Sequence, residues 1–166
     1  YKVTAVKEYY DMDEKIFTTT NKADLELAIN LDLGSSEFVY IRGNLMIKIN
    51  PIYFDLDKSF IRPDAQLELE RVVRIMEKYP LLKINLGSHT DSRASDSYNW
   101  SLSNRRAQSS KNWIVSQGID ANRINAQGYG ETELVNKCSN DVICSEADHQ
   151  LNRRTEFIIT NPEVIK

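Results

Sequence analysis

Helical spacing of apolar residues, together with residues that begin and end helices, predicts two long helices. The first begins at Pro63, which suits the first helical turn, and ends before Pro80, which cannot continue a helix. The second covers about residues 95–117, and Gly118 suits the left-handed position that follows a helix. The apolar stripe of the first helix consists of Leu67, Leu69, Val72, Val73, Ile75, Met76 and Tyr79.

Shorter segments of alternating apolar and polar residues predict the strands of a sheet. They cover residues 45–49 with 51–55 (one strand or a bent pair), 82–86, 122–128 and 153–160, with a polar loop at 87–93. The resulting order is β-α-β-α-β-β. It predicts an α/β fold of the α+β sandwich kind, in which a mixed sheet has both helices packed on one face.

The first 44 residues differ in pattern from the rest of the chain. Residues 2–5, 18–20 and 25–31 alternate and look like strand material. We therefore expect residues 1–44 to be flanking strands or the tail of a preceding β module, and residues 45–166 to be the main domain. The opening has no charged segment followed by an apolar one, so it predicts no signal peptide.

Charge and composition narrow the classes of function. Lys and Arg total 21 against 24 Asp and Glu, a net charge of −3, and this argues against a general nucleic-acid binder because such proteins carry a basic excess. No apolar run approaches the roughly 18–20 residues of a membrane-spanning helix. Apolar residues make up 41% of the chain, which is typical of a globular protein rather than a disordered one.

Five separated motifs resemble the OmpA-like C-terminal domain family, in the family's order and with plausible spacing. They lie at residues 52–63, at 88–92 (SHTDS), at 98–107 (YN, then LSNRRA), at 128–131 (GYGE) and at 152–156 (NRRTE). The resemblance covers about residues 45–160. Ser88 and Ala94 stand where the family usually has Gly, and residues 131–151 form a longer loop than the family minimum.

The resemblance implies a periplasmic module that holds the peptidoglycan wall without catalysis and without a cofactor or metal. Such a module tethers an outer-membrane protein or complex to the wall, so the implied location is the periplasm, in association with the outer membrane. The implied partners are peptidoglycan and, besides it, outer-membrane or periplasmic proteins. The run SHTDSRASD at residues 88–96, the long loop and the two cysteines are similar to versions in Bacteroidota envelope proteins, some of them in secretion machines.

Asp91 and Arg106 are the candidate ligand-binding pair. Diaminopimelate of the peptidoglycan stem peptide ends in one ammonium and one carboxylate, so its receptor needs a fixed anion and a fixed cation. Asp91 follows a predicted strand, Arg106 lies 15 residues further on in a predicted helix, and a strand-loop-helix unit can turn both toward one cleft. Asp91 would accept hydrogen bonds from the ammonium, and Arg106 would bind the carboxylate through its planar fork.

Four further residues complete the predicted binding site: Thr90, Asn99, Leu102 and Arg153. Asn99 and Leu102 share a helix face with the predicted cation, and Asn99 can hydrogen-bond the peptide backbone. Thr90 adds a donor near a helix N-terminus, where carboxylates are favoured. Arg153 and Arg154 point to opposite faces of a predicted strand, and the resemblance favours Arg153 as the site residue.

His89 and the two cysteines allow more than one interpretation. His89 lies near Asp91, but no recognisable motif places a Ser or Cys nucleophile, so a structural histidine that hydrogen-bonds across the loop is favoured over a general base. A disulfide between Cys138 and Cys144 fits an oxidising periplasm. Free thiols and a metal site with His149 are the other possibilities.

Two other functions are alternatives to wall binding. One is a peptidoglycan-processing amidase or peptidase, which needs a bound metal or an activated nucleophile. The other is a protein–protein assembly domain of an envelope or secretion complex, with the cysteine loop and the N-terminal strands as its interface.

Overall fold

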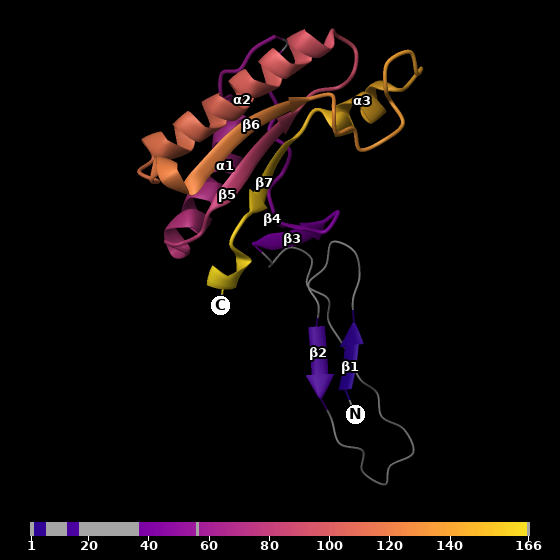
Figure 1. The fold of residues 1–166 in the computed structure, drawn as a ribbon. Coiled ribbons are helices and arrows are strands. Elements are labelled where there is room, and N and C mark those ends of the chain that lie inside the picture. The colour runs from indigo at the N-terminus through magenta and orange to yellow at the C-terminus, as the bar shows by residue number, and fades with distance from the viewer. Residues whose placement is uncertain (1, 6–12, 17–36, 56, 166) are drawn as a thin grey trace, which may run out of the picture.

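A five-stranded mixed sheet forms the centre of the computed structural model (Figure 1). The structure describes residues 2–5, 13–16, 37–55 and 57–165. The strands stand in the order β3-β4-β7-β5-β6. They are β3 (Phe38–Ile41), β4 (Asn44–Ile47), β5 (Ile84–His89), β6 (Ile124–Gly130) and β7 (Thr155–Ile159).

Two long helices, α1 (Pro63–Lys78) and α2 (Asp96–Ser116), enclose the hydrophobic core against this sheet. Alternate side chains of the central strands enter the core, as expected for a sheet that is covered on one face. The core includes Leu69, Val72 and Met76 of α1, Ala107 and Ile114 of α2, and Ile84, Leu86, Phe157 and Ile159 of the sheet. The predicted fold, a mixed sheet with both helices on one face, is confirmed.

β5 brings together three segments that are far apart in the sequence. It pairs in parallel with β6, for example Leu86 with Ala126, and antiparallel with β7, for example Leu86 with Phe157. The carboxyl end of β5 therefore lies beside the end of β6 and the start of β7. The loops connected to these three positions therefore meet at the same end of the sheet.

The limits of both long helices agree closely with the prediction. α1 begins at Pro63 and ends at Lys78, two residues before Pro80. α2 is capped by Ser95, whose side chain accepts a hydrogen bond from the backbone N–H of Tyr98. Gly118 follows α2 with a φ of 101°, as its predicted role requires.

α2 packs directly against the backbone of β6 at Gly128. A Cβ atom at this position would lie 2.2 Å from the backbone nitrogen of Asn104, so only glycine fits. The Asn104 side-chain oxygen accepts a hydrogen bond from the Gly128 N–H, and Ser103 Oγ accepts one from the Gly130 N–H. These contacts hold α2 over the end of the sheet.

The strand prediction for residues 51–55 is wrong. The chain leaves the sheet after Ile47, and Pro51 has no N–H with which to continue a ladder. Asn50 is instead held by Glu68 of α1, whose carboxylate accepts from the Asn50 backbone and side-chain N–H groups.

The predicted loop at residues 87–93 begins too early. Small and polar residues at 87–89 are typical of a loop, but they belong to β5 because strands lie on both sides of them. Ser88 pairs with Gly128 of β6 and with Thr155 of β7. β6 likewise continues past its predicted end to Gly130.

A third helix, α3 (Glu146–Asn152), interrupts the long loop before β7 and is absent from the sequence prediction. Ser145 and Asp148 form a capping box at its start, which is visible in the sequence, but seven residues are too few for a helical period to stand out. α3 ends at Asn152, directly before residues 153–154. The prediction that these two residues belong to the last strand is therefore wrong, and β7 begins at Thr155.

At the N-terminus, β1 (Lys2–Ala5) and β2 (Asp13–Ile16) pair with each other, which confirms the strand predicted at 2–5. The strand predictions for 18–20 and 25–31 lie outside the described residues. β3 pairs along its length with β4, so the five-stranded sheet includes residues before position 45. The division of the chain into 1–44 and 45–166 stays a prediction.

Candidate functional site

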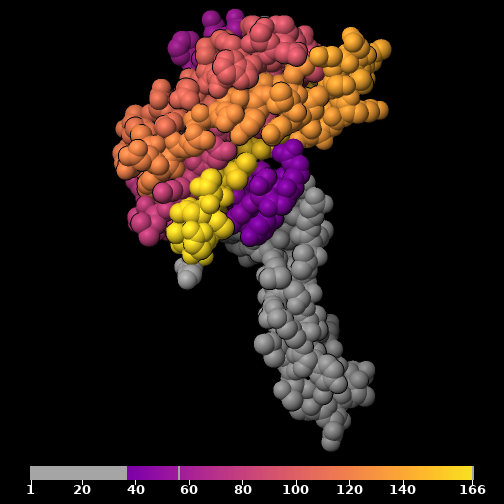
Figure 2. Space-filling model, viewed as in Figure 1, coloured from indigo at the N-terminus to yellow at the C-terminus, as the bar shows by residue number. Residues whose placement is uncertain are grey.

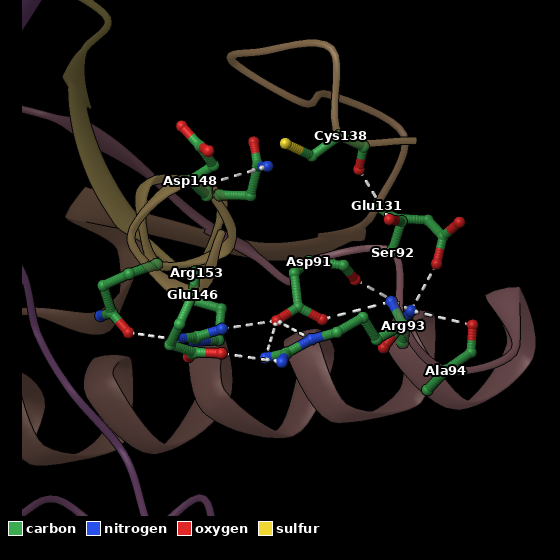
Figure 3. A network of polar contacts seen from close by, with 12 residues as sticks. Asp91, Ser92, Arg93, Ala94, Glu131, Cys138, Glu146, Asp148 and Arg153 are labelled. Atoms are coloured by element: carbon green, nitrogen blue, oxygen red, sulfur yellow. Dashed lines mark hydrogen bonds and ion pairs between the residues drawn. The ribbon is translucent and has the colours of Figure 1, made fainter. Parts of the chain in front are cut away.

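Asp91 lies at the centre of a charged network just after β5 (Figure 3). Its Oδ2 accepts hydrogen bonds from Arg93, through Nη2 at 2.7 Å and Nε at 3.2 Å, and from Arg153, through Nη1 at 2.6 Å. Glu146 of α3 closes the network, because its carboxylate oxygens lie 2.8 Å from Arg93 and 2.5 Å from Arg153. Two carboxylates and two guanidiniums therefore alternate around a ring of charge-assisted hydrogen bonds.

Asp91 stays ionised although it is buried. The residue is 8% exposed, and burial by itself raises the pKa of a carboxyl group. The hydrogen bonds from Arg93 and Arg153 outweigh this burial and hold the pKa of Asp91 below its ordinary value of 3.8. Asp91 is therefore a fixed negative charge at neutral pH.

Arg106 of α2 is a buried cation with a different kind of environment. It is 7% exposed, and its guanidinium donates to two backbone carbonyls, of Lys58 at 3.1 Å and of Asp55 at 3.3 Å. The guanidinium also lies 4.9 Å from the centre of the Phe54 ring. Within the described part of the chain, no carboxylate is close enough to form an ion pair with it. Burial lowers the pKa of Arg106 from its ordinary value.

Arg106 and Arg153 line one small cavity of ≈ 50 Å³. Arg154 also lines it, together with Ser88, His89 and residues 52–54, and none of the lining residues is acidic. The cavity has room for one small group, and the charge around it favours an anion. Arg153 thus connects the two halves of the predicted pair, because it contacts Asp91 and shares the cavity with Arg106.

The structure places the other predicted residues within the same region, mostly as buried supports. Asn99 donates a hydrogen bond to the Asp91 carbonyl at 3.1 Å and another to the Glu131 carboxylate, so it holds the loop in place. Thr90 is buried, and its hydroxyl has no hydrogen-bond partner among the described residues. Leu102 is also buried. Ligand contact by these three residues stays a prediction.

The two neighbouring arginines take different partners. Arg153 contacts Asp91, Glu146 and Gln150, whereas Arg154 pairs with Glu156 through Nε at 2.6 Å. The choice of Arg153 as the ligand-binding residue stays a prediction, but the expected placement of the two arginines on a strand is wrong. The two side chains diverge at the end of α3, not on opposite faces of a strand.

His89 is a packed residue of β5 rather than a loop residue. Its ring stacks on Tyr129, with centroids 5.1 Å apart and planes 11° apart, and its Nε2 lies 3.7 Å from the Glu156 carboxylate. The predicted hydrogen bond across the loop is wrong: neither ring nitrogen has a hydrogen-bond partner among the described residues. Burial raises the pKa of Glu156, but His89 and Arg154 outweigh it and bring the value to about 2.

Cys138 and Cys144 form a disulfide, as one of the interpretations of the sequence predicts. Their sulfurs are joined to each other and so are not thiolate ligands for a metal. Ser92, next to Asp91, donates a hydrogen bond to the Cys138 carbonyl at 2.6 Å. The disulfide loop is thereby tied to the loop that carries the charged network.

Arg93, Glu146 and Gln150 are the members of this region that the sequence analysis missed. Arg93 lies inside the SHTDSRASD run, so its position beside Asp91 was a usable signal. Glu146 and Gln150 reach the network only because α3 folds back over the end of β5. Figure 2 shows the loop before α3, in orange, protruding at that end of the molecule.

Comparison with known proteins identifies the class of this domain. The sequence profile of the OmpA family matches residues 53–146, more than half of the chain. The chain belongs to the OmpA family, which confirms the resemblance noted in its motifs.

Relatives of this family extend the comparison. The peptidoglycan-associated lipoprotein of Brucella melitensis is 34% identical over 108 residues, which cover 65% of this chain and 61% of the lipoprotein. The C-terminal domain of Helicobacter pylori MotB is 25% identical, with a TM-score of 0.60 over 71% of this chain and 90% of that domain. The cell wall anchor of the type VI secretion system from Pseudomonas aeruginosa is 26% identical, with a TM-score of 0.56 over 69% and 78%.

The chain spans only about three fifths of the length of that lipoprotein. Among the described residues, none of the helices combines the length and the apolar character needed to cross a membrane.

Proposed function

We propose that this chain binds peptidoglycan non-covalently through the diaminopimelate of the stem peptide, and so anchors an outer-membrane protein or complex to the cell wall. The observation that carries the proposal is Arg106: a buried guanidinium, without a carboxylate partner in the described residues, that opens onto a cavity shared with Arg153. A buried charge without a partner destabilises a fold. A ligand carboxylate in this cavity would supply the missing charge.

The end of the diaminopimelate side chain matches the two halves of the site. Its carboxylate fits the cavity lined by Arg106 and Arg153, where two guanidiniums can each donate to it. Its ammonium fits Asp91, whose Oδ1 accepts one long hydrogen bond from the described residues, 3.3 Å from the Arg93 backbone nitrogen, and so retains acceptor capacity. The ionised state of Asp91 keeps this interaction in place at neutral pH.

The proposed role is binding without a chemical step. A carboxyl group whose pKa lies below the ordinary value, as for Asp91, is a weak general base. The relatives support the same role, because a lipoprotein is named for its association with peptidoglycan and a secretion-system subunit is named as a cell wall anchor. We place the domain in the periplasm, where a Cys138–Cys144 disulfide is stable.

Co-sedimentation with purified sacculi tests the proposal. We expect Asp91→Asn and Arg106→Met to reduce the bound fraction at least about tenfold, because each removes one of two charge-assisted contacts. Arg106→Met should leave the free energy of unfolding within about 1 kcal/mol, since the two lost hydrogen bonds to carbonyls are offset by removal of a buried charge that has no carboxylate partner among the described residues. Arg74→Gln, which removes an exposed arginine of α1 that is 3.9 Å from Glu70, is the matched control.

Full binding by both site variants would contradict this assignment. Soluble wall fragments released by the wild-type protein, measured with and without a chelator, would instead favour the hydrolase alternative.

A further inference from the structure

The Asp91 carboxylate is already occupied in this structure by cations of the chain itself. Three N–H groups converge on Oδ2: two from Arg93 and one from Arg153 (Figure 3). A ligand ammonium that approached Asp91 would meet both guanidiniums. Arg106, in the adjoining cavity, adds a third positive charge against the two carboxylates of Asp91 and Glu146. Departure of one internal cation would therefore strengthen the binding of an external one, which Asp91 Oδ1 can already accept.

The two guanidiniums differ in how firmly they are held. The Arg153 side chain is 24% exposed, contacts Glu146 and Gln150 besides Asp91, and lines the anion cavity. The Arg93 side chain is 50% exposed, donates twice to Asp91 and has Glu146 as its one other partner among the described residues. Glu146 is itself largely exposed, so it can follow Arg93 when that side chain turns outward.

Space for a displaced Arg93 lies beside the network. Arg93 lines a second, open hollow of ≈ 390 Å³ between residues 92–96 and the disulfide loop. Two acidic residues, Asp96 and Asp141, line the same hollow, so a guanidinium that turns into it finds negative charge there. Arg93 is therefore the cation that can leave Asp91 at the lower cost.

We infer that Arg93 is a specificity-determining residue: it is an internal competitor that occupies Asp91 and yields only to a ligand carrying its own ammonium. This inference rests on the proposed function, and it names the side chain that competes with the ligand ammonium for Asp91. A ligand with an ammonium replaces the Arg93 contact at Asp91 with its own. A ligand with carboxylates alone gains nothing at Asp91, leaves Arg93 in place and binds only at the arginine-lined cavity.

The test compares diaminopimelate with pimelate, the same seven-carbon dicarboxylate without ammonium groups, by calorimetric or NMR titration of the full chain. We expect Arg93→Gln to bind diaminopimelate about fivefold more tightly than the wild type, the effect of removing one partly exposed ion pair. Pimelate should bind Arg93→Gln no better than it binds the wild type. Arg74→Gln, which removes an exposed arginine of α1 outside the proposed site, should change neither affinity.

Unchanged or weaker binding of diaminopimelate by Arg93→Gln would overturn the inference, and weaker binding would make Arg93 a ligand contact instead. An equal gain for both ligands would overturn it as well, because a general loosening of the site does not depend on an ammonium. These results are separate from a failure of the proposed function. That failure appears as sacculus binding that Asp91→Asn leaves intact.

Discussion

Single residues near the end of β5 show how burial and pairing set the charge of each group. Asp91 is buried and the Glu156 side chain is 11% exposed, and both remain ionised because basic side chains contact them: arginines at Asp91, and His89 and Arg154 at Glu156. Arg106 receives no such compensation from the described residues and is held by carbonyls and an aromatic ring. The contrast separates carboxylates whose partners lie within the fold from a cation whose partner we propose to be a ligand.

Glu156 provides a pH-dependent test at this scale. Its pKa in the folded chain is about 2 against an ordinary value of 4.5, so its ionised form stabilises the fold fully above pH 4.5. That contribution is lost as pH falls from 4.5 toward 2. We expect wild type to exceed Glu156→Gln in free energy of unfolding by up to about 3 kcal/mol at pH 7, and the gap to narrow at low pH.

Chemical denaturation at several pH values between 2 and 7 measures this gap. Glu70→Gln, an exposed residue 3.9 Å from Arg74, should show no comparable change with pH. A constant difference between wild type and Glu156→Gln from pH 7 to pH 2 would contradict the assigned role.

Elements of the fold meet at the site because of three connections. Asp91 lies two residues after the end of β5, and Arg106 lies in α2. Glu146 is the first residue of α3, and Arg153 directly follows the last residue of α3. α2 is held by its close approach to β6, and α3 is held by Asn136 and Asn152, which link it to the chain before Cys138. The position of each charge therefore depends on the packing of an entire element.

Gly128→Ala tests the close approach of α2 and β6. The new Cβ would lie 2.2 Å from the Asn104 backbone nitrogen, so the helix must move away from the strand. We expect a loss of about 3 kcal/mol in the free energy of unfolding, measured by denaturant titration. Gly43→Ala, in a turn where a Cβ meets nothing within 4 Å but φ is 81°, should cost only about 1 kcal/mol. Similar losses for both variants would argue against a steric cause.

At the scale of the whole molecule, the five-stranded sheet begins at Phe38 and no described residue before it belongs to that sheet. β3 is an edge strand whose turn brings Arg42 into contact with Glu156 of β7. The five-stranded sheet therefore extends a few residues before position 45, where the pattern of the sequence changes.

Two truncations test this boundary. Removal of residues 1–36 leaves every strand of the five-stranded sheet, so we expect unchanged stability and unchanged sacculus binding. Removal of residues 1–44 deletes β3 and should lower the free energy of unfolding by at least about 2 kcal/mol, because β4 loses its hydrogen-bonded neighbour and the core loses Phe38. Loss of wall binding on removal of 1–36 alone would contradict the first expectation and make the N-terminal segment a part of the wall-binding unit.

Local pattern was sufficient for the parts of the fold that are set by local interactions. Pro63, Pro80 and Gly118 mark the helix ends through their own backbone properties, and the apolar stripe of α1, apart from the exposed Leu67, indicates its buried face. Residues 87–89 were misjudged because their strand is imposed by neighbours on both sides. α3 was missed because seven residues carry too little periodicity.

By itself the sequence determined the family, the two long helices and the identity of Asp91 and Arg106 as candidates, since motifs and periodicity depend on neighbours along the chain. Only the tertiary structure decided which charges meet. Asp91 lies within hydrogen-bond distance of Arg153, 62 residues away, because β5 and β7 pair and α3 folds over their common end. Contacts of that kind depend on the register of strands and the packing of helices, which no local pattern specifies.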